Sequence, residues 1–145
     1  MQKYYEPVFN RKLELEEVIA NCEIAIIYDG VMYSYMNDDE EMLTLGAAES
    51  LLKEKASLFD KKVREHHYTL GENNELRINF SELKAAITDK TRFLVIRDPD
   101  FLAGKVFSDA EVDELIALIK SKPSLYVLFD RRVDFLLDRK SDKFA

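Results

Sequence analysis

The sequence predicts an α/β domain of three layers, in which helices cover both faces of a mostly parallel sheet. Two apolar runs lie at 93–96 and 125–129, with an amphipathic helix pattern between them; Asp130 follows the second run directly, and Asp98 follows the first after Arg97. The order strand, helix, strand is typical of a right-handed crossover that places both strands parallel in one sheet. Runs this apolar are expected where both faces of the sheet are covered.

The composition fits a single domain spanning residues 1–145. A chain of 145 residues can bury one hydrophobic core, and 47% apolar with 34% charged residues is a globular balance. No repeat or linker divides the sequence. We expect the two ends, 1–10 and 139–145, to be irregular.

Charge and cysteine content exclude several classes of function. A net charge of −7 argues against nucleic acid or an anionic membrane as a partner. No run reaches the roughly 20 apolar residues of a membrane span, and the first residues lack a signal-peptide core. A single cysteine, Cys22, forbids an internal disulfide and fits a reducing compartment. These features predict a cytoplasmic protein.

The first third of the chain is predicted to form a short helix and a β-hairpin. The helix covers 11–21, and an apolar strand follows at 23–28. The dipeptide Asp29-Gly30 is a strong turn signal, so 31–36 is expected to return as the second strand. The acidic run 37–41 is read as a solvated loop, because its spacing does not match a cation-binding loop.

Four side chains on the predicted hairpin are interface candidates: Met32, Tyr33, Tyr35 and Met36. Tyrosine and methionine are enriched in protein interfaces, which favours a contact surface. The alternative is that these residues form the ordinary core of the hairpin.

The middle of the chain is predicted to hold a long helix over 46–65. Its apolar positions repeat with the helical period; they are Ala48, Leu52, Ala56, Phe59 and Val63. A short strand is expected at 66–70, and its adjacent histidines point to opposite faces, which argues against a metal site. A half-exposed strand follows at 76–80.

The second half carries clearer helix signals. Ser81 is expected to cap a helix whose buried residues are Leu83, Ala86 and Ile87. Ser108 and Glu111 have the spacing of a capping box, which predicts that the next helix begins there.

Aspartates follow several predicted strands, and Asp98 and Asp100 are the ligand candidates among them. Ligands of open α/β sheets bind at the carboxyl ends of the strands, so the placement suits a binding or catalytic site. Aspartate after a strand is also a common turn and cap residue, and this second interpretation stays open.

Residues 42–138 resemble the central part of fold-type I pyridoxal-phosphate aminotransferases, in the branch of histidinol-phosphate aminotransferase and threonine-phosphate decarboxylase. The resemblance rests on Thr44–Leu51, Phe80–Arg92, Asp98-Pro99 with Gly104–Ser108, Leu128–Asp130 and Asp134–Leu136. It implies a reduced version of the aminotransferase large domain. A generic strand–helix–strand pattern is the alternative explanation.

The resemblance also implies a cofactor site. By this match, Gly46 and Ala47 open the helix that holds the cofactor phosphate, and a helix start suits an anion. Asp130 matches the carboxylate that pairs with the pyridinium nitrogen.

Several departures from the family pattern argue against catalysis. Phe101 replaces an asparagine that donates to the cofactor, and Val133 replaces a tyrosine. Arg131 and Arg132 stand where they could neutralise Asp130. The Schiff-base lysine and the small domain of the family lie downstream of the matched region, so we expect no catalytic residues.

The sequence therefore leaves three functions open. The leading expectation is a non-catalytic domain that acts by protein interaction or self-association, including a homodimer. The alternatives are a binder of a small ligand or pyridoxal phosphate, and a small enzyme that uses strand-end aspartates. We expect no cofactor and no metal, with pyridoxal phosphate as the cofactor that the resemblance allows.

Overall fold

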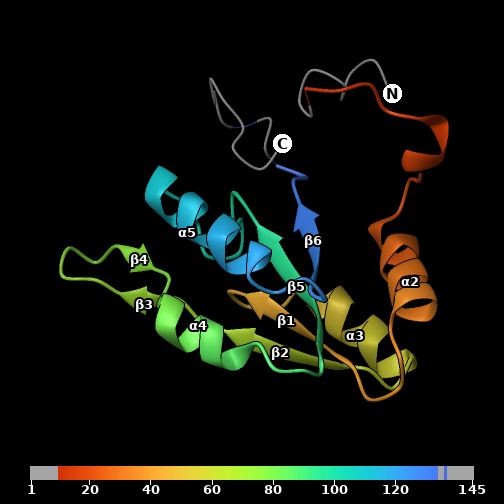
Figure 1. Ribbon diagram of the computed structural model, residues 1–145, viewed down its shortest axis with the longest axis horizontal. Helices are drawn as coiled ribbons and strands as arrows, with labels where there is room; N and C mark the ends of the chain where they lie inside the picture. Colours follow the sequence, from red (N-terminus) through yellow and green to blue (C-terminus); the bar gives the residue numbers. More distant parts are fainter. Residues whose placement is uncertain (1–9, 134–135, 137–145) are drawn as a thin grey trace.

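A four-stranded parallel sheet lies between two pairs of helices in the computed structural model, which describes residues 10–133 and 136 (Figure 1). The strand order is β2 (Lys62–His66), β1 (Glu41–Leu45), β5 (Thr91–Arg97) and β6 (Tyr126–Asp130), and each neighbouring pair is parallel. The predicted α/β class with a mostly parallel sheet is confirmed. All four strands end at one edge of the sheet, which is called the carboxyl edge below.

Side chains of the two central strands, β1 and β5, point alternately to the two faces of the sheet and so contribute to two separate hydrophobic cores. Leu43 and Leu94 face α4 (Phe80–Ala86) and α5 (Asp109–Lys120). Met42 and Phe93 face α2 (Ile24–Tyr35) and α3 (Ser50–Leu58). Because successive strand residues point to opposite faces, the apolar residues at 42–43 and 93–96 need cover on both sides of the sheet.

The elements with the clearest sequence signals lie where they were predicted. Ser108 Oγ accepts from Glu111 N, and Ser108 N donates to Glu111 Oε2 at 2.9 Å, so the capping box starts α5. Val112 and Leu115 of α5 are buried. The strands at 93–96 and 125–129 correspond to β5 and β6, and β6 lies at an edge of the sheet.

The predicted hairpin at 23–36 is wrong, because residues 24–35 form helix α2. A short apolar run cannot be assigned to strand or helix by periodicity alone. Asp29 and Gly30 lie inside the helix, where Asp29 Oδ2 accepts from Lys55 Nζ of α3 at 2.9 Å. The predicted helix at 11–21 is reduced to one 3₁₀ turn, η1 (Leu15–Glu17).

The predicted helix over 46–65 is shorter than expected. It covers only α3, and a Schellman motif ends it: Asp60 has φ +53°, and Lys61 N donates to Ala56 O at 2.8 Å. Leu52 and Ala56 are buried as predicted. The later apolar positions belong to the turn and to β2. Strand β1 was not predicted from the sequence.

The region between β2 and α4 forms a small antiparallel hairpin of β3 (Thr69–Leu70) and β4 (Leu76–Arg77). The next helix begins at Phe80, one residue before the predicted cap. Asn79 is the actual N-cap, because its Oδ1 accepts from Glu82 N. The irregular ends expected at 1–10 and 139–145 lie, apart from residue 10, outside the described residues.

The four interface candidates divide into two classes. Met32 and Met36 are 0% and 8% exposed and belong to the core beneath α2, so their proposed interface role is wrong. Tyr33 and Tyr35 are 82% and 55% exposed. Met32 and Tyr33 differ in exposure because they lie on different sides of α2, one packed against the core and the other facing solvent. Within the described residues, no helix is long and apolar enough to cross a membrane.

This division predicts opposite outcomes for adjacent residues. Met32→Ala should lower the free energy of unfolding by about 2 to 5 kcal/mol, because it leaves a cavity in a packed core. Tyr33→Ala should change it by less than about 0.5 kcal/mol. Urea denaturation followed by circular dichroism measures both. Equal losses for the two variants would contradict the orientation of α2.

Candidate functional site

The carboxyl edge of the sheet carries a cluster of charged side chains. The cluster consists of Glu49, Arg97, Asp100, Asp130 and Arg132, which lie at or just beyond the ends of β1, β5 and β6. Ligands of open α/β sheets bind at this edge, so these residues define the candidate site. Their contacts fall into two ion-pair networks.

The first network is centred on Arg132. Its Nη2 lies 2.7 Å from Asp130 Oδ2 and its Nε donates to Asp130 Oδ1 at 3.0 Å. The same Nη2 lies 2.7 Å from Glu49 Oε2, which also accepts from Tyr28 Oη at 3.0 Å. Hydrogen bonding to Asp130, and then to Glu49, raises the pKa of Arg132 above its ordinary value. Both oxygens of Asp130 are therefore engaged by one guanidinium group.

The second network is centred on Arg97, which is 2% exposed. Its Nε lies 3.3 Å from Asp100 Oδ1, and its Nη2 donates to the carbonyl oxygen of Ala47. Asp100 Oδ2 accepts from Tyr68 Oη at 2.9 Å. Burial, followed by the charge of Asp100, raises the pKa of Tyr68, which keeps the phenol protonated. This network joins the loops after β1 and β5 to the residue before β3.

Phe101 lies between the two networks. Arg132 Cζ is 5.2 Å and Arg97 Cζ is 5.9 Å from the centroid of its ring. Both distances are within the range of cation–π attraction. The family resemblance places a hydrogen-bond donor to the cofactor at this position. Here the ring of Phe101 instead contacts two arginine side chains.

In the segment matched to the phosphate-binding turn, backbone N–H groups donate hydrogen bonds to other groups of the same chain. Gly46 N donates to His66 O at 2.8 Å, and Ala48 N donates to Glu65 Oε1 at 2.8 Å. Helix α3 starts at Ser50, with Glu49 as its N-cap, so the helix start lies beyond Gly46 and Ala47. Gly46 has φ +83°, and a Cβ there would collide with the Asp100 carboxylate. The cofactor role of Gly46, Ala47 and Asp130 stays a prediction.

The two ligand candidates hold their own loop together. Asp98 and Asp100 are both 0% exposed. Asp98 Oδ1 accepts from Phe107 N at 3.0 Å, and Asp100 Oδ1 accepts from Leu102 N at 3.1 Å. These contacts support the alternative interpretation of the strand-end aspartates as turn residues. Direct binding of a ligand by either carboxylate stays a prediction.

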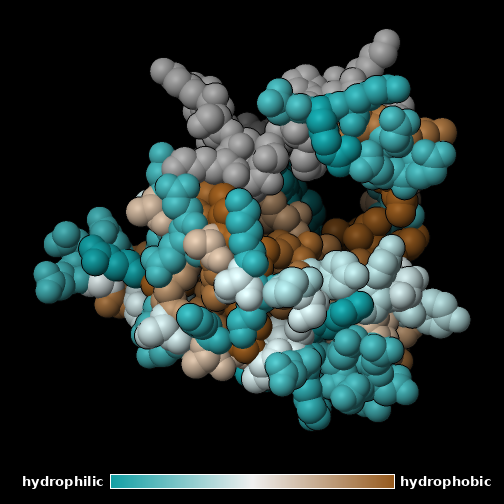
Figure 2. All heavy atoms as spheres, viewed as in Figure 1, coloured by the Kyte–Doolittle hydropathy of each residue, from teal (hydrophilic) through white to brown (hydrophobic). Residues whose placement is uncertain are grey.

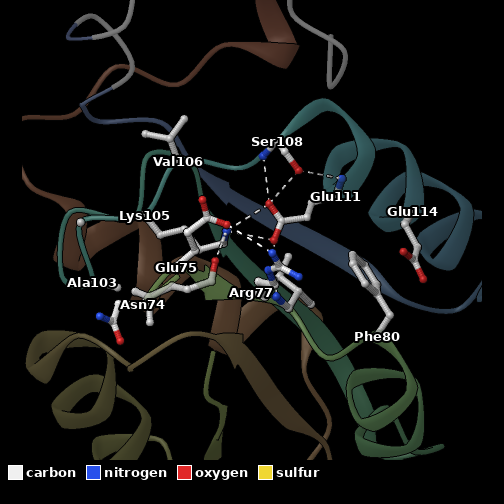
Figure 3. Close-up of a pocket in the computed structure, with 13 residues that line it drawn as sticks. Asn74, Glu75, Arg77, Phe80, Ala103, Lys105, Val106, Ser108, Glu111 and Glu114 are labelled. Carbon is white, nitrogen blue, oxygen red and sulfur yellow. Dashed lines mark hydrogen bonds and ion pairs between the residues drawn. The ribbon is translucent and has the colours of Figure 1, made fainter. Parts of the chain in front are cut away.

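A cavity of about 830 Å³ lies elsewhere, between the β3–β4 hairpin and the start of α5 (Figure 3). Lys105 Nζ donates to Leu76 O at 2.7 Å and pairs with Glu111 at 2.9 Å. The lysine thus ties the hairpin to α5. None of the residues that the sequence predicted for a site lines this cavity.

Sequence reasoning missed Arg97, Glu49 and Tyr68. The spacing Arg97-x-x-Asp100 was a usable signal, because a cation and an anion three residues apart after a buried strand can close a turn. No comparable signal marks the pair between Glu49 and Arg132, which are separated by 83 positions.

The buried Arg97 yields the first prediction from this site. Arg97→Met should lower the free energy of unfolding by about 3 to 5 kcal/mol, because it leaves the Asp100 carboxylate buried without its cation. Adding Asp100→Asn removes that charge and should recover part of the loss. Arg77→Met, which breaks an exposed pair with Glu75, is the control and should cost less than about 1 kcal/mol. A double variant as unstable as Arg97→Met alone would contradict the charge argument. Urea denaturation measures all three variants.

A second prediction concerns His66, which is 8% exposed. Burial lowers its pKa below the ordinary 6.5, against the opposing charge of Glu82. The unfolded chain therefore binds a proton at higher pH than the folded chain, so stability is lost as pH falls below about 6.5, by at most about 1.4 kcal/mol per pH unit. His66→Gln should remove this loss in urea denaturation between about pH 7 and pH 5. The neighbouring variant His67→Gln should keep it, and a loss that persists in His66→Gln would assign it to another group.

The comparisons with known proteins agree on an aminotransferase fold. No protein-family model matches the chain. The aspartate aminotransferase of Sulfolobus acidocaldarius is 26% identical over 89% of this chain and 32% of its own length. The alanine aminotransferase of Pyrococcus furiosus superposes with a TM-score of 0.80 at 13% identity, over 97% of this chain and 35% of that one. The chain thus spans about a third of the length of these relatives.

One comparison corrects the expectation that no cofactor is involved. The crystal structure of cystalysin from Treponema denticola, which contains pyridoxal 5'-phosphate, matches 89% of this chain and 32% of its own, with a TM-score of 0.75 and 12% identity. This finding contradicts the expectation that a chain of this fold has no cofactor. The similarity extends to aspartate and alanine aminotransferases, so it is not specific to the predicted histidinol-phosphate branch. The chain has the α/β fold of fold-type I aminotransferases, over about a third of their length.

Proposed function

We propose that this chain is a domain of aminotransferase type that acts by association with another protein chain and does not transaminate by itself. The observation that carries the proposal is the bidentate contact of Arg132 with Asp130. The carboxylate matched to the cofactor ring nitrogen is already neutralised by a side chain of the same protein.

The charges around this contact support the proposal. The site contains three carboxylates, Glu49, Asp100 and Asp130, and two arginines. Arg97 pairs with Asp100, and Arg132 pairs with both Glu49 and Asp130. A phosphate group brought to this edge would meet more negative than positive charge. Pyridoxal phosphate therefore fits the residues present only in part: Asp130 has suitable chemistry, but Arg132 has to leave it first.

The lysines of the described residues also support the proposal. A Schiff base needs a lysine amine that can reach the cofactor. The side chains that contact Asp100, Asp130 and Glu49 are arginines and tyrosines, with no described lysine among them. The ammonium group of Lys105 lies over the rings of Tyr68 and Phe107, at 5.8 and 5.6 Å from their centroids. Its ammonium group is held by Leu76 O and Glu111.

Exposed aromatic side chains favour the association part of the proposal. The rings of Tyr35 and Tyr126 lie 6.2 Å apart, and Arg92 stacks 4.4 Å from the centroid of Tyr126. Tyr35 and Tyr126 are 55% and 45% exposed. Tyrosine and arginine carry much of the binding energy in protein interfaces.

A turnover assay tests the proposal. The purified chain, with added pyridoxal phosphate, an amino-acid donor and 2-oxoglutarate, should form no more glutamate than a control without protein. The full-length aspartate aminotransferase of Sulfolobus acidocaldarius serves as the positive control. Turnover that disappears in Asp130→Ala would overturn the proposal.

Binding of pyridoxal phosphate is the second candidate function. It is favoured by the position of Asp130 at the carboxyl end of β6 and by the cofactor in cystalysin. Arg132→Ala should then tighten binding about tenfold, because a competing charged hydrogen bond is removed. Asp130→Ala should abolish binding. Arg131→Ala is the matched control, since Arg131 lies over Phe129, 5.6 Å from the centroid of its ring. A titration followed by visible absorbance measures these affinities, and weaker binding in Arg132→Ala would contradict the competition.

A further inference from the structure

The amino ends of β5 and β6 carry positive charge on an acidic chain. The two strands are parallel and pair Phe93 with Tyr126, so the residues before Phe93 lie beside those before Tyr126. Segments 90–92 and 120–126, called the basic surface below, contain no acidic residue; their cations are Lys90, Arg92, Lys120 and Lys122. Figure 2 shows hydrophilic atoms, in teal, over the lower right of the molecule, where the amino ends of the strands lie in Figure 1. The whole chain has a net charge of −7, so the basic surface differs in sign from the rest.

The lysines of the basic surface make no side-chain hydrogen bond or ion pair within the part of the chain that the structure describes. By contrast, Lys53 and Lys55 of α3 each pair with a carboxylate. Lys120 lies in the last turn of α5, where a cation complements the helix dipole. Lys90 and Lys122 lie in loops, so neither a helix end nor an ion pair accounts for their charge.

Tyr126 is an aromatic group that the basic surface holds in place. The centroid of its ring lies 5.5 Å from that of Phe93 and 6.2 Å from that of Tyr35, and Arg92 Cζ lies 4.4 Å from it. Arg92 Nε donates to Tyr35 O at 3.0 Å and lies 3.8 Å from Glu40 Oε2. Tyr126 is nevertheless 45% exposed. A ring that is already ordered loses little conformational entropy when a partner covers it, so Tyr126 suits a contact surface.

We propose that the basic surface binds an acidic segment of another protein. Carboxylates of that segment pair with Lys90 and Lys122, and an apolar side chain between them packs on the exposed part of the Tyr126 ring. The proposal rests on the proposed function by association and names the chemistry of the partner. Tyrosine and arginine are enriched among the residues that dominate binding energy in interfaces, and both are present here.

Charge favours this occupant over two others. A segment with several carboxylates is repelled by most of a chain of net charge −7 and attracted by the basic surface, which fixes where it docks. A second copy would place this surface against itself at a twofold axis, where Lys90 and Lys122 would meet like charges. Nucleic acid is a longer polyanion, and the net charge of the chain opposes it beyond the few cations available.

Fluorescence anisotropy with labelled probes tests the proposal on the full chain. The probe is the peptide Glu-Asp-Phe-Glu-Asp, and its matched control is Gln-Asn-Phe-Gln-Asn, in which every side-chain carboxylate is an amide. The acidic peptide should bind saturably and at least about tenfold more tightly than the amide peptide. Added salt should reduce this difference, because it screens the charges. Equal binding of the two peptides, or binding of neither, overturns the proposal. Tighter binding of a short oligothymidylate would assign the surface to nucleic acid instead.

Charge reversal locates the site. Lys90→Glu combined with Lys122→Glu should weaken binding of the acidic peptide about 100-fold, because two attractive pairs become repulsive. Lys12→Glu combined with Arg77→Glu is the matched control: it changes the net charge equally at side chains that are 78% and 60% exposed elsewhere, and it should change the affinity less than about threefold. Tyr126→Ala should weaken binding about tenfold, whereas Tyr126→Phe should retain it. Equal losses in the two double variants would overturn the basic surface as the binding site.

Folding and function are controlled separately. Circular dichroism checks that each variant is folded; if the double glutamate variant fails to fold, Lys90→Gln with Lys122→Gln replaces it and should weaken binding about tenfold. A chain that neither transaminates nor binds the acidic peptide overturns this inference and leaves the proposed function standing. Turnover that Asp130→Ala removes overturns the proposed function and leaves the measured peptide affinities unchanged.

Discussion

The buried guanidinium of Arg97 is the contact on which the carboxyl edge of this sheet depends. It is 2% exposed, and it reaches the carboxylate of Asp100 and the carbonyl of Ala47 at once. A buried charge is tolerated only with compensating partners, so the loops after β1 and β5 must stay where those partners are. Phe101 and Tyr68 are positioned by the same requirement, because each contacts one member of the pair.

Internal compensation and ligand binding compete at such an edge. The groups that parallel strands present at their carboxyl ends can be satisfied by a ligand or by one another. Here the Arg132 side chain makes five contacts of 3.3 Å or less with the carboxylate oxygens of Asp130 and Glu49. A ligand that binds Asp130 has to displace its bidentate contact with Arg132. Charge-assisted pairs of this kind are among the stronger polar contacts in proteins. A ligand at this edge therefore competes with contacts made within the chain.

The sequence predicted those parts of the fold that depend on local signals. The capping box at Ser108 and the apolar run of β5 depend on neighbouring residues, and both were found. The charged cluster depends on residues that only the sheet brings together, such as Glu49 and Arg132. No spacing rule reports such a pair. Strand β1 was missed for a related reason: its polar members Glu41 and Thr44 are buried, and both contact Arg64 of the neighbouring strand β2.

The error at α2 has its physical origin in the composition of the helix. A surface helix normally shows its identity through a charged face, and that face produces the 3.6-residue pattern by which helices are recognised. In 24–35 the outward positions are as uncharged as the inward ones, so the segment looks like a strand covered on both faces. The missing polar face that misled the sequence analysis is the same property that leaves Ile26 and Tyr33 in water. Removing that apolar area from water stabilises whatever covers it, at roughly 25 cal/mol per Å².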